Sequence, residues 1–127
     1  MNFTEDELSR RIPVWYALSD LFTARELQDY DYKWMAEVLN ASGYSRETLF
    51  EILDEEVAPA LLGNLLFNPT PVIDGWEQKE VKDLVLRHLN KKLALIEWFI
   101  PHVFLLKKRQ NIIRKERALL SEALDEY

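Results

Sequence analysis

The chain has 127 residues, of which 48% are hydrophobic and 30% charged, and its formal net charge is −6 at pH 7. This length is typical of one domain, and the apolar content suffices for a core, which excludes a disordered chain. The lack of cysteine excludes disulfides and thiolate metal sites, and the negative charge argues against a nucleic-acid-binding protein. We therefore expect a single domain spanning residues 1–127.

The first segment predicts a helix that begins after Thr4. Thr4 and Glu7 have the spacing of a capping box, in which each side chain satisfies a backbone N–H group of the first turn. Pro13 lacks an N–H group, so we expect it to interrupt or restart this helix. The acidic opening of the chain disfavours a secretory signal, and we expect a cytoplasmic protein. The apolar residues that follow have helical spacing: Val14, Trp15, Leu18, Leu21 and Phe22.

A second helix is predicted from about Tyr30 to Ser42, after a polar connection over residues 23–29. Gly43 is expected to close it, because glycine adopts the left-handed C-cap conformation at little cost. We expect its buried face to contain Trp34, Val38 and Leu39.

The third helix is predicted to begin after Ser45, which has the side chain of an N-cap residue. Pro59 is expected to kink or restart it, and residues 60–66 continue as a short buried piece. The prolines at 69 and 71 cannot continue a helix, so a loop is expected there. The apolar positions of this helix are Leu49, Phe50, Ile52, Leu53 and Val57.

The last third of the chain predicts further helices, which begin near Asp74 and near Leu93. The apolar stretch 93–106 is too short for a bilayer of about 30 Å and contains Glu97 and Pro101, so we interpret it as a core helix bent at the proline. A final amphipathic helix is expected to bury Ile112, Ile113, Leu119, Leu120, Ala123 and Leu124. With only three glycines for tight turns, the pattern predicts an all-α bundle of about six to seven helices with proline-marked kinks.

Charge is unevenly distributed along the sequence. Residues 1–83 contain seventeen Asp or Glu against seven Lys or Arg, for −10, and residues 84–127 contain five against nine, for +4. Within the third helix, Glu47, Glu51 and Glu55 are successive i, i+4 neighbours, and Asp54 lies beside them; such like-charge pairs repel. These carboxylates form either a solvated face paired with the basic C-terminal segment, or a docking surface for a basic partner. A cation site is disfavoured, since one helix face does not surround an ion.

A second acidic group is interleaved with tyrosines, which suit protein interfaces because they give a large contact area and keep a polar tip. The same residues also fit an ordinary loop and N-cap followed by core aromatics. The group comprises Glu26, Asp29, Tyr30, Asp31 and Tyr32.

The basic run over residues 107–117 allows three interpretations: a solvated face, a contact with RNA or anionic lipid, or a surface for self-association. His88 and His102 lie far apart in apolar segments and are read as core residues. We find no phosphate-binding glycine loop, no HExxH and no nucleophile elbow. The sequence therefore predicts a protein that is not an enzyme and has no metal or cofactor.

Three segments resemble an uncharacterised family of small bacterial proteins: residues 11–22 (RIPVWYALSDLF), residues 55–59 (EEVAP) and residues 64–66 (NLL). The resemblance covers about residues 8–90 and leaves the apolar and basic part, residues 91–127, outside it. It implies a bacterial source and a compact domain.

In size, charge and lack of catalytic motifs, the chain is also similar to contact-dependent-inhibition immunity proteins. That likeness implies a cytosolic partner that neutralises a toxin, often a nuclease, by covering its basic cleft. We expect the two acidic groups to be the contact surface and the protein to bind neither nucleic acid nor membrane. The alternative is a helical adaptor that self-associates through its C-terminal helix.

Overall fold

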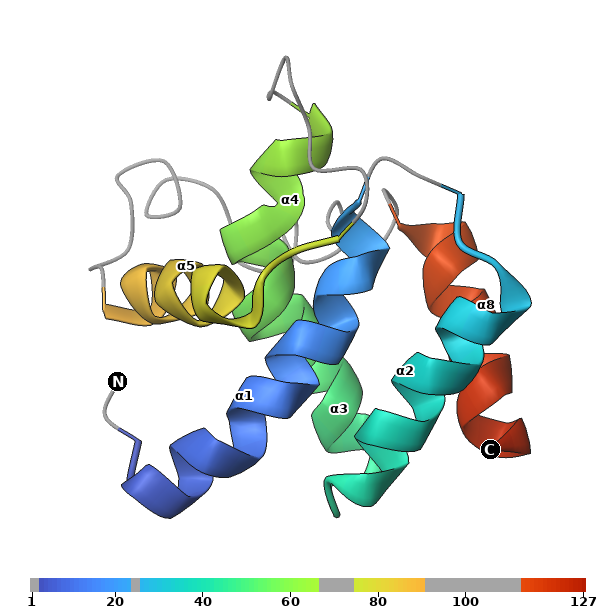
Figure 1. Cartoon of the computed structure of the whole chain (residues 1–127), viewed down its shortest axis with the longest axis horizontal. Coiled ribbons are helices and arrows are strands. Elements are labelled where there is room, and N and C mark those ends of the chain that lie inside the picture. Colours follow the sequence, from blue (N-terminus) through green and yellow to red (C-terminus); the bar gives the residue numbers. More distant parts are fainter. Residues whose placement is uncertain (1–2, 24–25, 67–74, 91–112) are drawn as a thin grey trace.

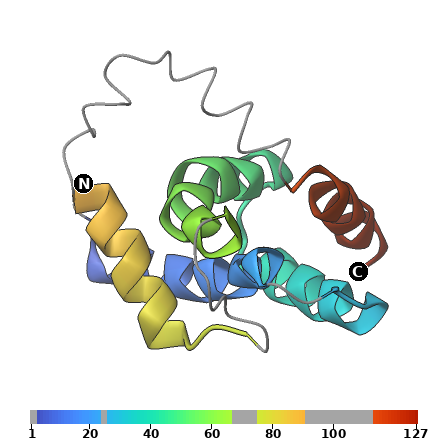
Figure 2. The same ribbon diagram turned by 90° about the horizontal axis from the view of Figure 1, so that it is seen from above.

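The computed structural model describes residues 3–23, 26–66, 75–90 and 113–127, and most of these residues lie in helices. Helices α1 and α2 lie side by side, with α3 and α4 behind them (Figure 1). Helices α5 and α8 lie at opposite ends of this group in both views (Figures 1 and 2). The all-α class is confirmed.

Helix α1 spans Glu5–Ser19 and continues into a 3₁₀ turn, η1, at Asp20–Phe22. Half of the predicted capping box is present, because the Glu7 N–H group donates to the Thr4 hydroxyl over 3.1 Å, whereas the Glu7 carboxylate pairs with Arg11. The predicted interruption at Pro13 is wrong, since the helix passes through it. Pro13 has no N–H group to donate to the carbonyl of Ser9, four residues earlier. Ser9 is exposed, so water can donate to this carbonyl instead.

Helix α2 spans Asp29–Ala41, within one residue of the prediction at each end. Gly43 follows in the left-handed region with φ +81°, as expected of a residue that closes a helix. The predicted buried face is only partly correct. Leu39 is fully buried, but Trp34 is 39% exposed, and Met35 and Ala36 occupy the core instead.

The next helices form one continuous rod, in which α3 spans Arg46–Ile52, a π-helical segment η2 spans Leu53–Val57 and α4 spans Ala58–Leu66. Ser45 caps α3 by accepting from the Thr48 N–H group over 3.1 Å, as predicted. Pro59 neither breaks nor restarts the rod. A proline ring clashes with the carbonyl four residues earlier, here that of Glu55, and the rod widens into a π-helix around that residue.

Helix α5 spans Gln78–Asn90 and α8 spans Arg114–Glu126. With α3, η2 and α4 counted as one rod, the described residues form five helices, fewer than the six to seven predicted. The expected core helix at 93–106 and the loop at 68–71 lie outside the described residues. Within the described parts of the chain, no helix has both the length and the apolar composition needed to cross a membrane.

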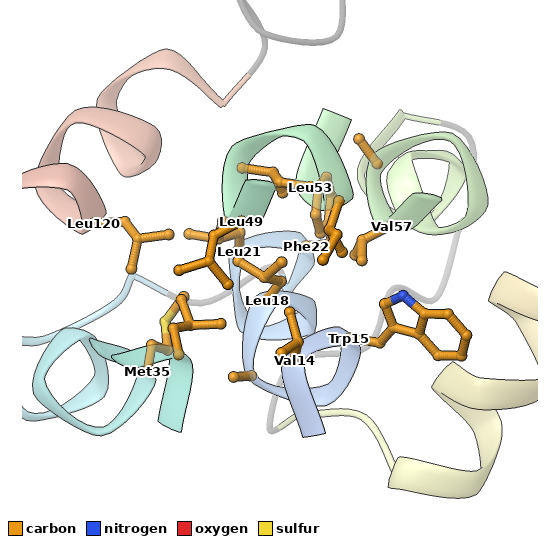
Figure 3. Packing of buried hydrophobic residues seen from close by; sticks show 14 of the residues in the cluster. Val14, Trp15, Leu18, Leu21, Phe22, Met35, Leu49, Leu53, Val57 and Leu120 are labelled. Atoms are coloured by element: carbon orange, nitrogen blue, oxygen red, sulfur yellow. The ribbon is translucent and has the colours of Figure 1, made fainter. Parts of the chain in front are cut away.

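The core lies where α1 meets the rod and α2. Val14, Trp15 and Leu18 of α1 face Leu53 and Val57 of the rod (Figure 3). On the other side of α1, Met35 of α2 and Leu120 of α8 close the same cluster. Helix α8 packs on α2, while α5 packs on α1 and α4, so the exposed surfaces of α2 and α8 adjoin at one end of the molecule (Figure 2).

Candidate partner-binding surface

The α3 carboxylates form the first candidate surface. Glu47, Glu51 and Glu55 are all exposed along one side of α3 and η2, as their spacing predicts. Arg46, their neighbour in sequence, is directed to α8, where its guanidinium lies 2.6 Å from the Asp125 carboxylate and 2.8 Å from the Ser121 carbonyl oxygen. Neither Glu47 nor Glu51 forms an ion pair with a described residue. We call Glu47 and Glu51 the α3 acidic pair.

Asp54 is separated from these carboxylates because its side chain is buried. Both of its oxygens accept hydrogen bonds from the Arg117 guanidinium of α8, one of them over 3.0 Å. Its relative exposure is 7%, so a partner at the surface would not reach it directly. Asp54 therefore links the rod to α8 through an ion pair with Arg117. The exposed acidic surface of α3 lacks this carboxylate, which was predicted from the sequence to be part of it.

The second acidic group also divides into exposed and buried members. Glu26 and Asp29 are exposed, and Tyr30 is 69% exposed, which is the position expected of interface residues. Asp31 is buried and accepts from the Gln28 N–H group over 2.8 Å, so it stabilises the start of α2. Tyr32 is also 7% exposed, and burial together with the charges of Glu116 and Asp31 raises its pKa to about 12.

Helix α8 lies between the two acidic groups. It packs against α2 (Figure 2), and Arg46 at the start of α3 pairs with Asp125 of α8. The two groups predicted from sequence are therefore not one continuous patch. Each adjoins α8 from a different side.

A groove lies between the N-terminal half of α2 and α8, with a volume of about 200 Å³. Its sides combine three carboxylates with two tyrosines and two small or aliphatic side chains. We call it the α2–α8 groove; it is lined by Asp29, Tyr32, Leu119, Glu122, Ala123, Glu126 and Tyr127. At its edge, the Lys33 ammonium lies 5.6 Å from the centre of the Tyr127 ring and 4.0 Å from the Glu37 carboxylate.

The exposed aromatic and large aliphatic side chains gather on the same two helices. Among the described residues, the exposed large hydrophobic side chains are Tyr30 and Trp34 on α2, Leu119 on α8 and Tyr127 directly after α8. Tyr30 and Trp34 are one turn apart and share a face of α2. Trp34 also contacts Tyr16 of α1 edge to face, with 5.7 Å between ring centres, which holds it in place. Such gatherings commonly mark interaction surfaces.

Sequence reasoning missed the α8 half of this surface, because it treated the C-terminal region as basic. A signal was nevertheless present. Glu122, Asp125 and Glu126 occupy the end of α8, where the helix dipole disfavours negative charge, and no basic residue lies in the last turn. Asp125 is matched by Arg46, but no described cation forms an ion pair with Glu122 or Glu126.

A buried polar cluster joins two of the segments that carry the family resemblance. Glu56 of η2 accepts hydrogen bonds from the Arg11 guanidinium and from the Trp15 indole N–H group, the latter over 2.8 Å. Arg11 also donates to Glu7 over 3.1 Å, and the side chain of Glu56 is 11% exposed. Glu56 lies between α1 and the rod, and its partners are structural, so we place it outside the partner surface. Burial lowers the pKa of Arg11, but the attraction of Glu56 outweighs this and leaves it raised.

The exposed carboxylates of both acidic groups were also candidate metal ligands. In the described part of the chain, no three Asp, Glu or His side chains converge closely enough to hold a metal ion.

Comparison with known families gives one match, which covers residues 9–122 and carries the description "Domain of unknown function (DUF7079)". The chain belongs to this family. The match extends past residue 90, so it includes the C-terminal region that the resemblance in sequence left out. Neither the curated proteins nor the solved structures contain a match to the chain.

Proposed function

We propose that the protein is a non-enzymatic inhibitor, an immunity protein of bacterial origin that binds and neutralises a basic toxin domain. The partner we infer is a nuclease of contact-dependent growth inhibition, because a nuclease needs a positively charged cleft for phosphates. The protein would occupy that cleft with carboxylates and so prevent access of the nucleic acid.

The observation that carries this proposal is the excess of exposed negative charge. Among the described residues, fourteen Asp or Glu are exposed against seven Lys or Arg. The carboxylates that the fold requires, Asp31, Asp54 and Glu56, are buried and hydrogen-bonded, so they are distinct from the exposed ones. The exposed set includes the α3 acidic pair, whose repulsion lowers stability and which a basic partner would offset.

The alternative of a self-associating adaptor has less support. Leu120, Ala123 and Leu124 of α8 are buried within the chain, against α2 and the core. The described part of α8 therefore presents Leu119 as its exposed large aliphatic side chain, at 36% exposure. A dimer interface through this helix would need a larger apolar area.

The test is protection from a toxin encoded beside the gene. The C-terminal domain of a large secreted protein encoded immediately upstream would be expressed in a sensitive host, alone and together with this protein. We expect growth to stop without the protein and to continue with it, and the purified pair to form a stable complex. Growth arrest in both cases, or no such gene upstream, would refute the proposal.

Charge-reversal variants locate the surface. Glu47→Lys with Glu51→Lys should weaken the complex, because it replaces attraction by repulsion at the partner's cationic surface. Glu80→Lys with Asp83→Lys on α5 is the matched control. It changes the net charge equally and involves a first-turn carboxylate and a neighbour one turn later. It lies on α5, at the end of the molecule opposite α8 (Figure 2). Equal effects of the two variants would show that only net charge matters.

A further inference from the structure

The size of the α2–α8 groove limits what it can hold. Its volume of about 200 Å³ lies below the roughly 300–1,000 Å³ of pockets for small-molecule ligands. It is also open to solvent along one side, between two helices that both belong to the surface rich in exposed aromatic residues. These features suit one long side chain inserted from a protein partner better than a free metabolite.

The groove lining indicates the chemistry of that side chain. Asp29, Glu122 and Glu126 provide carboxylate acceptors, while Tyr32 and Tyr127 provide ring surfaces. Leu119 and Ala123 add an aliphatic wall for methylene groups. A planar cation with several N–H donors can bind the carboxylates and stack on a tyrosine ring. If this cation is carried on an apolar stem, the stem can contact the aliphatic wall.

We propose that the α2–α8 groove is the anchor site for an arginine side chain of the protein partner. The inference rests on the proposed function, in that it assumes a basic protein partner, and it specifies which chemical group that partner inserts and where. The guanidinium would donate to the carboxylates on α2 and α8 and lie against a tyrosine ring, while its stem contacts Leu119. Arginine is among the residues that most often dominate binding energy in interfaces.

The number of groove carboxylates and their origin on two helices favour a guanidinium over an ammonium group. A lysine ammonium is a compact charge that one carboxylate can satisfy, whereas a guanidinium presents five N–H donors in a fixed plane. The three groove carboxylates come from two helices, Asp29 from α2 and Glu122 and Glu126 from α8, so they can accept from different edges of such a plane. The Lys33 ammonium lies 5.6 Å from the centre of the Tyr127 ring, so this ring already faces one positive charge of the chain itself.

The negative charges around the groove favour the binding of a positively charged group. Partial burial and the neighbouring carboxylates of Glu126, Asp29 and Glu37 raise the pKa of the Tyr127 phenol. Glu122 and Glu126 also lie near the end of α8 that disfavours negative charge. A bound guanidinium would relieve both kinds of repulsion, and removal of these charges in the free protein should therefore not destabilise it.

The first experiment uses a small probe with the full-length protein. The peptide acetyl-Gly-Arg-Gly-amide would be titrated while amide chemical shifts are recorded, beside matched peptides with citrulline or lysine in place of arginine. We expect saturable shifts at Leu119, Glu122, Ala123 and Tyr127 with a dissociation constant on the order of millimolar for arginine, weaker binding for lysine and none for citrulline. Equal shifts with citrulline, or no saturation with arginine, would overturn the assignment.

The second experiment uses variants in the complex with the toxin domain. Glu122→Gln with Glu126→Gln should weaken toxin binding at least tenfold and abolish the arginine-peptide shifts, while the free protein unfolds at the same or a higher temperature. Glu77→Gln with Glu80→Gln on the far side of the molecule is the matched control and should change neither measurement. An unchanged toxin affinity in the groove variant would refute the inference.

The two proposals fail in different ways. If the protein gives no protection from a toxin but the groove still binds the arginine peptide, the proposed function falls and the groove chemistry stands. If protection is complete, and neither the peptide nor the groove variant has an effect, only the arginine anchor is wrong.

Discussion

Replacement of Glu56 by alanine should produce a large loss of stability. This carboxylate holds α1 against the rod, since it accepts from both Arg11 and Trp15. The two charged side chains are mostly buried, with exposures of 14% for Arg11 and 11% for Glu56, and Trp15 is fully buried. Removal of the acceptor leaves a guanidinium and an indole N–H group without their buried partner.

The size of the effect follows from these contacts. Breaking a buried ion pair costs about 3–5 kcal/mol, and an unsatisfied buried donor costs about 1–3 kcal/mol. Arg11 keeps its contact with Glu7, which reduces the loss, so we expect a cost near the lower end of the range for the ion pair alone, about 3–4 kcal/mol. Glu56→Gln should cost only about 1–2 kcal/mol, because the amide oxygen still accepts from Trp15 while the charge is lost.

Urea unfolding followed by tryptophan fluorescence and circular dichroism measures these differences. Glu7→Gln is the control, since it contacts the same Arg11 from a side chain that is 43% exposed, and it should cost less than about 0.5 kcal/mol. A double-mutant cycle of Arg11→Met with Glu56→Gln should give a coupling of about 1–2 kcal/mol. If Glu56→Ala and Glu7→Gln destabilised the protein equally, the structural role of Glu56 would be refuted.

Three further predictions concern other parts of the fold. Asp54→Asn should destabilise the protein by about 2 kcal/mol and make α8 more accessible to limited proteolysis, because it removes the ion pair with Arg117. Unchanged proteolysis would contradict a structural role for this ion pair. Gly43→Ala should cost about 1 kcal/mol in thermal unfolding, because φ is +81° and the new Cβ would lie 3.1 Å from the Arg10 guanidinium; a gain in stability would contradict this backbone conformation. The pKa of Tyr32 is about 12 when folded against about 10 when unfolded, so its contribution to stability is present below pH 10 and is lost as the pH rises toward 12. Tyr32→Phe should therefore lose less stability than the parent between pH 10 and pH 12, and an identical pH profile would refute this; the exposed Tyr30→Phe is the control.

Local features of the fold were predicted well from sequence. The caps at Thr4 and Ser45 and the left-handed Gly43 depend on residues within three positions of each other, and each is present. The interruption predicted at Pro13 is wrong, whereas Pro59 directly follows a π-helical segment that distorts the rod locally. Pro13 and Pro59 lie in helices whose burial against the core outweighs the loss of one backbone hydrogen bond, so the helices continue through them.

The candidate site could be predicted only in part. The exposed positions of Glu47, Glu51, Asp29 and Tyr30 follow from helical spacing and polarity. The burial of Asp54 does not, because it depends on Arg117, a residue 63 positions away. The groove likewise joins Asp29 and Tyr32 of α2 to residues 119–127, which are far away in sequence, and spacing within one segment cannot predict such a contact.

The proposed role of the exposed negative charge in binding is tested most directly by measuring the rate of association with the toxin domain at increasing salt concentration. For the parent protein we expect fast association that slows steeply as salt rises, and for Glu47→Lys with Glu51→Lys a rate about tenfold lower at low salt, with the difference shrinking at high salt. The α5 variant Glu80→Lys with Asp83→Lys should stay close to the parent. A rate that is independent of salt, or equal in all three proteins, would contradict an electrostatic role for this surface.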